Sequence, residues 1–498
     1  MNLDHLLPLM VVASSLIPGL VIFALGEQRK TARTILNLGG ASVKLLLVAM
    51  MLWGVSQDHV YVVRFPITQS IDFALHADPF SLLFVTLSAV LWFLTTIYAI
   101  GYLENLPHCG RFFGFFSLCV AATSGIALSA NLLTFLVFYE MLTLTTYPLV
   151  VHRGTPEAIR GGRIYLAYTV SGGAVLLLAM VWLQSIVGPV EFVVGGFLES
   201  AGHEYRNTFR WIFALLIVGF GVKAALVPLH GWLPEAMVAP APVSALLHAV
   251  AVVKAGAFGI VRVVYDVFGV EFCGELGVAT PLAIAAAVTI LYGSLRAVYQ
   301  NDLKRRLAYS TISQVSYIAL GAAIVGPIAT VGGIVHLVHQ GLMKITLFFA
   351  AGNLAETLGI HEVSELNGVG RRMPWTMSAF TIAALGMIGV PPMAGFVTKW
   401  LLGSGAIAAG QWWVVGVLAG STVLNAIYFL PIVYATWFKP PDGPWPHDHG
   451  RGRFETHLLL LIPPVLTAIS VVLVGLLASM PFSPLDWARL IVEREYRP

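Results

Sequence analysis

GFGVKAALVPLHGWLPEA, residues 219–236, and LGMIGVPPMAGFVTKW, residues 385–400, are two apolar stretches that each place a lysine near prolines. Proline removes a backbone donor and clashes with the preceding turn of a helix. We therefore predict helix breaks at Pro228 and at Pro391 and Pro392. A break frees carbonyl groups that protein or water must satisfy, which favours a hydrated interior. The alternative is that these residues have no special role, because glycine and proline are common in membrane helices.

The composition places most of the chain in lipid. Of its 498 residues, 58% are hydrophobic and only 11% are charged, whereas soluble domains carry about 25% charged residues. The net charge of +3 indicates no nucleic-acid partner. The three cysteines, Cys109, Cys119 and Cys273, lack metal-binding spacing, so we expect neither a metal nor a disulfide.

Apolar segments long enough to cross the hydrocarbon core, which takes about 20 residues, recur along the chain. Fourteen are predicted, at about 5–25, 34–54, 78–101, 111–129, 131–150, 163–185, 209–230, 239–263, 279–298, 303–325, 330–355, 375–402, 411–437 and 457–479. We therefore expect an all-α polytopic membrane protein with about 14 transmembrane helices. The last 19 residues are interpreted as a short polar tail.

Lysine and arginine residues outside the spans are unevenly divided between the two sides of this topology. An even number of spans places both termini on one side, and the loops on the other side carry most of the basic residues. Cytoplasmic loops carry the basic excess in membrane proteins. Both termini are therefore expected on the non-cytoplasmic side of a cell (inner) membrane.

Several ionisable residues fall inside the predicted spans, where a charge costs ~2.5–3.5 kcal/mol on insertion scales. Arg262 lies at a helix end and is expected to reach the interface. Lys44 has no evident partner, and its role stays open. The other five come from five different spans: Glu140, Lys223, Lys254, Lys344 and Lys399. We predict that they form a proton path; ion pairs that only fix helix packing are the alternative.

Histidines accompany the lysine of the eleventh span, HLVHQGLMKITLFF, residues 336–349. His336, Gln340 and Lys344 share one helix face, because they are four residues apart, and His339 lies beside them. Histidine titrates near neutral pH, so this stripe is predicted to carry protons. The alternative is a set of polar residues that only satisfies the broken neighbouring helices.

Two further histidines are weaker candidates. His248 precedes Lys254 by six residues, roughly 240° around a helix, so the two do not share a face. Its role remains open. His230 follows Pro228 at the edge of the seventh span and is a candidate link between the interior and the surface.

The two broken spans lie five spans apart, and such a pair indicates an inverted repeat whose site lies at the breaks. We expect four parts. Residues 1–110 hold helices 1–3, 111–263 form the first repeat with helices 4–8, 279–437 form the second with helices 9–13, and 438–498 hold the last helix and the tail.

The chain resembles the antiporter-like subunits shared by complex I and Mrp-type cation/proton antiporters, over about residues 75–440. The matching stretches are NLLTFLVFYE (131–140), GVKAALVPLHGWLPEA (221–236), LLHAVAVVKAGAFGIVR (246–262), QNDLKRRLAYSTISQ (300–314), HLVHQGLMKITLFFAAG (336–352) and PPMAGFVTK (391–399). The resemblance implies a fourteen-helix core with two inverted five-helix repeats. It also implies that Glu140 pairs with Lys223 and that Lys254 and Lys399 continue a central polar axis.

Within that family, Lys399 and the short C-terminus are most similar to the D-type Mrp subunit or to complex I subunit N. Homologous subunits of membrane hydrogenases and inorganic-carbon uptake systems share WLPEAMVAPAPVSALLHAV, residues 232–250. The subfamily therefore stays open.

Three functions are compatible with the chain. The first is a proton-translocating subunit of a multisubunit monovalent cation/proton antiporter. The second is a proton-pumping subunit of complex I, of a hydrogenase or of a carbon-uptake system, and the third is a structural scaffold. The sequence has no nucleotide-binding glycine loop after a strand and no cysteine set for an iron–sulfur cluster. We expect no cofactor, other membrane subunits as partners, and protons as substrate; sodium, potassium or no cation would all fit.

Overall fold

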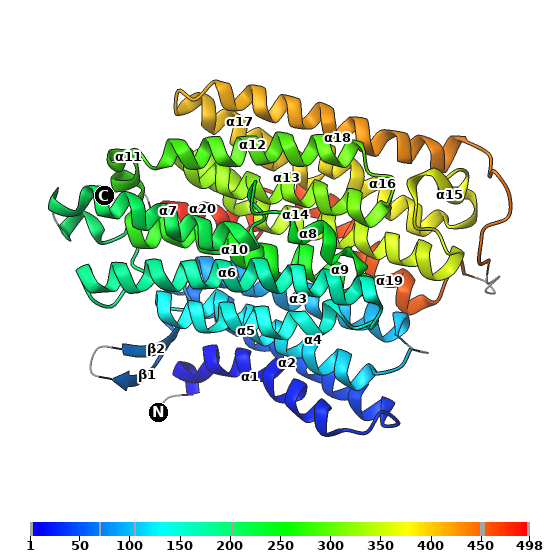
Figure 1. Ribbon diagram of the computed structural model, residues 1–498, viewed down its shortest axis with the longest axis horizontal. Helices are drawn as coiled ribbons and strands as arrows, with labels where there is room; N and C mark the ends of the chain where they lie inside the picture. Colours follow the sequence, from blue (N-terminus) through cyan, green and yellow to red (C-terminus); the bar gives the residue numbers. More distant parts are fainter. Residues whose placement is uncertain (1–2, 69–70, 104–105, 202, 449–453, 496–498) are drawn as a thin grey trace.

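Helices dominate the structure, a computed structural model that describes residues 3–68, 71–103, 106–201, 203–448 and 454–495. Most of them run side by side along one direction, and the two ends of the chain lie toward the same end of the bundle, on the left in Figure 1. We call this end the termini side and the other end the opposite side.

The α-helices have these bounds: α1 Leu3–Ala24, α2 Lys30–Ser56, α3 Pro79–Tyr102, α4 Cys109–Leu128, α5 Leu132–Val150, α6 Pro156–Val187, α7 Arg206–Lys223, α8 Trp232–Glu235, α9 Ala241–Ala249, α10 Val252–Arg262, α11 Val270–Leu276, α12 Ala279–Val298, α13 Leu303–Ala323, α14 Pro327–Leu358, α15 Val369–Arg372, α16 Pro374–Ile388, α17 Ala394–Ala408, α18 Trp413–Phe438, α19 Leu458–Leu476 and α20 Pro484–Glu495. A π-helix, η4, follows α10 over Val263–Phe268. In the described part of the chain, eleven helices are long and apolar enough to cross a membrane. The all-α, multi-pass membrane architecture is thus confirmed, whereas the count of fourteen spans is not.

Side-chain caps determine where several of these helices begin. The Asp78 carboxylate accepts a hydrogen bond from the backbone N–H of Ser81 at 2.7 Å, at the start of α3. The Asn131 side chain does the same for Thr134 at 2.8 Å, at the start of α5. Each such cap stabilises a helix by about 1 kcal/mol.

Three of the predicted spans are divided in the structure. The seventh ends as a helix at Lys223, and the twelfth is split into α16 and α17, as the prolines predicted. The eighth is also split, between α9 and α10 at residues 250–251, and this break was not predicted. The tenth, α13, is continuous but carries many buried hydroxyl and amide side chains, so its hydropathy does not mark it as a span.

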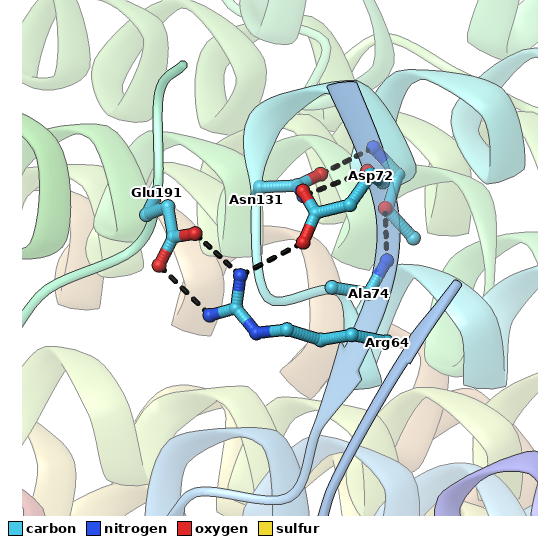
Figure 2. Close-up of polar contacts among 6 residues, drawn as sticks. Arg64, Asp72, Ala74, Asn131 and Glu191 are labelled. Atoms are coloured by element: carbon cyan, nitrogen blue, oxygen red, sulfur yellow. Dashed lines mark hydrogen bonds and ion pairs between the residues drawn. The ribbon is translucent and has the colours of Figure 1, made fainter. Parts of the chain in front are cut away.

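A β-hairpin on the termini side was not predicted. Its strands β1 (Val62–Thr68) and β2 (Ile71–His76) pair antiparallel. Arg64 of β1 donates to Asp72 of β2 at 2.8 Å and to both carboxylate oxygens of Glu191 at 2.5 and 2.9 Å (Figure 2). Its hydrogen bonds with Arg64 hold the pKa of Glu191 below its usual value. The hairpin is therefore fastened to the segment that follows α6.

The interpretation of the C-terminus as a polar tail was wrong. Residues Pro484–Glu495 form α20, which packs against α3 and α14. Leu485, Trp487, Ala488 and Ile491 are buried, and these positions recur at helical spacing. The tail is an amphipathic helix that covers part of the bundle.

Candidate proton path

Lys223 lies at the end of α7, where the helix breaks. Its side chain is buried, and Nζ donates to the backbone oxygen of Tyr139 and lies 3.3 Å from the centre of the Tyr139 ring. The carbonyls freed by the break find protein partners. Trp232 Nε1 donates to the Val222 oxygen at 2.7 Å, and the N–H of Leu226 donates to the Gly221 oxygen at 2.9 Å.

Glu140 is the neighbour of Tyr139 on α5, but this chain buries it only in part. Its carboxylate packs so closely on α6 that a Cβ at Gly173 would overlap Oε1. Among the residues described, no hydrogen bond or ion pair within 4.0 Å joins Glu140 to Lys223. The implied pair is therefore not a direct contact, because the Lys223 ammonium turns to the Tyr139 carbonyl instead.

Lys254 is fully buried in α10, and its Nζ has no hydrogen-bond partner among the described residues. Its helix packs directly on the broken end of α7. A Cβ added at Gly256 would overlap the backbone nitrogen of Ala224 and lie 2.8 Å from the Lys223 carbonyl carbon. Lys223 and Lys254 thus come from elements in backbone contact.

His248 lies in α9, and the break at residues 250–251 separates it from Lys254. The angle expected for an unbroken helix therefore does not apply. The His248 ring stacks on Phe348 of α14, with centroids 4.4 Å apart, and neither ring nitrogen has a partner in the part that the structure describes. Phe348 is one helical turn beyond Lys344, so His248 lies on the α14 side of this region.

Helix α14 is buried along its length and carries the polar stripe. Lys344 Nζ donates to the Leu307 oxygen at 3.1 Å and to the Ser310 hydroxyl, both on α13. His339 Nδ1 shares a hydrogen bond of 2.8 Å with Thr398 of α17. His336, one turn earlier, lies beside the Tyr317 ring at 5.2 Å. One helix thus presents titratable groups to both α13 and α17.

Lys399 lies on α17 just after the second break and is partly buried. Its Nζ donates to the Ile388 oxygen at 2.6 Å, to the Met387 oxygen at 3.2 Å and to the Thr422 hydroxyl at 2.9 Å. The ammonium group therefore caps α16, whose last carbonyls the break leaves free. Gly389 adopts φ +94°, and a Cβ there would lie 2.8 Å from Lys399 Cδ, so only glycine permits this approach.

Buried polar atoms without a protein partner gather along these elements. In the described residues they include Glu140 Oε1, Lys254 Nζ, both ring nitrogens of His248 and of His336, His339 Nε2, and the side-chain amides of Gln314 and Gln340. Buried polar groups are normally hydrogen-bonded, often through ordered water. Gln314 was missed from the sequence, although it follows Ser310 by one helical turn. The arrangement can accept water and pass protons from group to group.

His230 is half-buried after the first break. Its ring lies 5.0 Å from that of Tyr292 on α12, and Nδ1 has no partner among the described residues. The structure therefore does not bring His230 into contact with the lysines of the path.

The expectation that Arg262 reaches the interface was wrong. The side chain is 3% exposed, and it donates to Asp266 at 2.6 Å, to Asp78 at 2.5 Å and to the Ser81 hydroxyl at 2.8 Å. Two carboxylates compensate the buried charge, so the residue need not extend to water. Asp266, four residues after Arg262, was the signal in the sequence that could have shown this.

Lys44 has partners that the sequence did not reveal. Its Nζ donates to the hydroxyls of Ser15 at 2.8 Å and Ser124 at 2.6 Å, and lies 5.0 Å from the Trp92 ring centre. These side chains come from α1, α4 and α3, so Lys44 of α2 lies at the centre of the first four helices.

A polar cavity of about 290 Å³ opens on the opposite side. Glu235 and Arg305, which form an ion pair, lie in its wall together with Lys304 and His361. Leu303, at the start of α13, also lines it. Leu307 and Ser310, the partners of Lys344, lie one and two turns further along that helix. The cavity is therefore close to the lysine end of the α14 stripe.

Fold and site define an antiporter-type membrane subunit, and comparisons with known proteins agree. Residues 129–425 match the family model described as "NADH:quinone oxidoreductase/Mrp antiporter, TM", and residues 65–113 match "NADH-Ubiquinone oxidoreductase (complex I), chain 5 N-terminus". The chain belongs to this family of complex I and Mrp antiporter subunits.

Relatives fall on both branches of the family. NADH-quinone oxidoreductase subunit N of Desulforudis audaxviator is 33% identical, over 92% of this chain and 91% of its own. A probable K(+)/H(+) antiporter protein of Rhizobium meliloti, its A/B subunit, is 30% identical over 86% of this chain, which spans 42% of that longer protein. A chain in the structure of the Mrp complex from Dietzia has the same fold, with TM-score 0.85 and 22% identity over 100% of this chain and 98% of its own.

Proposed function

We propose that the chain is the proton-translocating subunit of a multisubunit monovalent cation/proton antiporter, similar to the D-type Mrp subunit. One observation supports this most: ionisable groups, several without protein partners, continue from the break after α7 to the break before α17. Charged groups inside a membrane domain are costly and typically mark ion or proton pathways. Protons pass along Glu140, Lys223, Lys254, His336, His339, Lys344 and Lys399 in this proposal.

The two halves of the path correspond to the proposed inverted repeats, residues 111–263 and 279–437. Lysine suits the task, because burial can bring its pKa down by about 3–5 units, toward neutral pH. Protons enter at the opposite-side cavity and reach Lys344 along α13. Water bridges the partnerless groups between Lys344 and Lys254.

Other membrane subunits are the proposed partners, in a cell membrane, with both termini outside the cytoplasm. The antiporter relatives and the Mrp complex support an antiporter. The relative named NADH-quinone oxidoreductase subunit N, which matches nearly full length, supports a second candidate: a proton-pumping subunit of a redox complex. Isolation of the assembly under mild detergent distinguishes them, because a redox complex retains flavin or iron–sulfur subunits and an antiporter does not.

The test of the path is a pair of substitutions at Lys223 and Lys399. Arginine keeps the positive charge but does not release a proton, because its pKa stays above about 12. We expect Lys223→Arg and Lys399→Arg to abolish driven proton movement in liposomes that hold the intact assembly. A scaffold role predicts the reverse, namely that the arginine variants keep their activity. Full transport in both variants, with normal assembly, would refute the path.

A further inference from the structure

A second cavity, also of about 290 Å³, lies on the termini side. His76 and Asp78 contribute to its wall from the segment between β2 and α3. Arg262 and Asp266 contribute from α10 and η4. The proposed proton path does not use any of these groups. The cavity lies on the side of the bundle away from the cavity near Lys344.

The charges in this cavity favour a cation. One guanidinium, Arg262, faces two carboxylates, Asp78 and Asp266, so the cluster is negative overall. Burial opposes ionisation of Asp78, but the Arg262 charge outweighs it and keeps the pKa of Asp78 below its usual value. His76 Nδ1 lies 4.0 Å from Asp78, and burial lowers the pKa of His76. At neutral pH the histidine is uncharged and can accept a proton beside a fixed carboxylate.

This cluster and the lysine of the path lie on one helix. Lys254, Phe258, Arg262 and Asp266 follow at intervals of four residues, so they share a face of α10 and η4. Four residues rise by about 6 Å along a helix axis. Arg262 is therefore about 12 Å from Lys254 along the axis, and Phe258 lies between them.

Phe258 is the centre of a dry aromatic layer at this depth. Its fully buried ring stacks on Phe80 at 4.4 Å and contacts Phe84 at 4.9 Å between centroids. The Arg262 guanidinium lies 5.1 Å from the Phe258 ring, on its cavity side. Hydrophobic constrictions stop ions by excluding water, so this layer closes the direct way from Lys254 to the cavity.

We propose that the cavity at His76, Asp78 and Asp266 is the port through which protons pass between Lys254 and the termini side, and that the Phe258 layer is its gate. The proposal rests on the proposed proton path. The alternative is that Arg262 and its carboxylates only fasten α3 to α10. The two differ in whether opening the aromatic layer exposes Lys254 to protons.

Removing the ring tests the gate without any driving reaction. Liposomes with the intact assembly and an internal pH dye receive an external pH step. Phe258→Ala should raise passive proton entry roughly tenfold, the change expected when a barrier falls by about 1.4 kcal/mol. Adding Lys254→Met should suppress the leak. The matched control is Phe272→Ala, because Phe272 is also buried on the termini side but lies on α11.

Equal leaks in Phe258→Ala and Phe272→Ala, or a leak that survives Lys254→Met, would overturn the gate. So would an assembled Phe258→Ala variant without a leak. None of these outcomes bears on Lys223→Arg, so the gate can fail while the path stands.

The port itself is tested in the wild-type gate background. His76→Cys provides a thiol in the cavity wall, and the three native cysteines are buried. A bulky cationic thiol reagent added on the termini side should inhibit driven proton movement, and a reductant should restore it. Glu271→Cys, an exposed site on the same side, is the control. Unchanged transport in fully modified His76→Cys would overturn the port.

Discussion

Buried lysines in this chain differ in what surrounds their ammonium groups. Lys399 and Lys344 donate to carbonyl and hydroxyl oxygens near a helix break or on a neighbouring helix. Lys254 has no partner in the described part of the structure. Lys44 is held between two hydroxyls in the first four helices. Chemical surroundings, and not burial alone, therefore separate candidates for the path from structural lysines.

Lys44 is expected to be dispensable for proton movement. Ser15 and Ser124 also donate to carbonyls of their own helices, at 3.2 and 2.8 Å, so both hydroxyls stay satisfied without the lysine. Lys44→Met should keep driven transport and change the free energy of unfolding by less than about 1.5 kcal/mol, as for a swap of similar volume. The same substitution at Lys254 should abolish transport. Loss of transport in Lys44→Met would place Lys44 on the path.

The candidate residues could be identified from sequence because charges are rare in apolar spans. Their partners could not, since these are neutral groups from distant segments: Ser124 is 80 residues from Lys44, and Tyr139 is 84 residues from Lys223. A backbone oxygen, as in the Lys223 contact, leaves no residue-type signal at all.

At the scale of elements, the breaks with prolines were predictable and the third was not. Pro228 and Pro391 mark the first two. Between α9 and α10 stand Val250 and Ala251, residues that normally continue a helix or strand, so tertiary packing against α14 decides that break. The hairpin was missed because its two short strands lie between long apolar spans.

Helix α20 is expected to contribute measurably to stability through Trp487. The indole is 6% exposed, and Nε1 donates to the Pro79 oxygen at 2.8 Å. Trp487→Ala should cost about 3–5 kcal/mol, as for other large core residues, and Trp487→Phe about 1–3 kcal/mol for the unsatisfied carbonyl. Thermal unfolding of the purified assembly measures both. Arg489→Ala, at an exposed site on α20, should change nothing; equal midpoints for all three variants would contradict this packing.

At the scale of the whole molecule, the all-helical membrane bundle followed from composition, since so few charges cannot cover a water-exposed surface of this size. The orientation of the bundle in the membrane remains a prediction. It depends on the basic residues at the opposite side, among them Arg305 and Arg306 at the start of α13.

Thiol labelling in intact cells tests that orientation. Asn301 lies in an exposed loop on the opposite side, and Glu493 is exposed on α20 at the termini side. An impermeant reagent should modify Glu493→Cys in intact cells, and Asn301→Cys only after the membrane is opened. The native cysteines are buried and should stay silent. Modification of Asn301→Cys alone in intact cells would reverse the assignment.

Helix α14 is continuous over 32 residues, and its polar side chains face different neighbours. Inserting or deleting one residue near its start would rotate every later position by about 100° relative to the earlier turns. Such a change would remove the contacts of His339 with Thr398 and of Lys344 with Ser310 at once. Length variation among homologous chains should therefore fall in the loops between helices, while the number of residues between His336 and Lys344 stays constant.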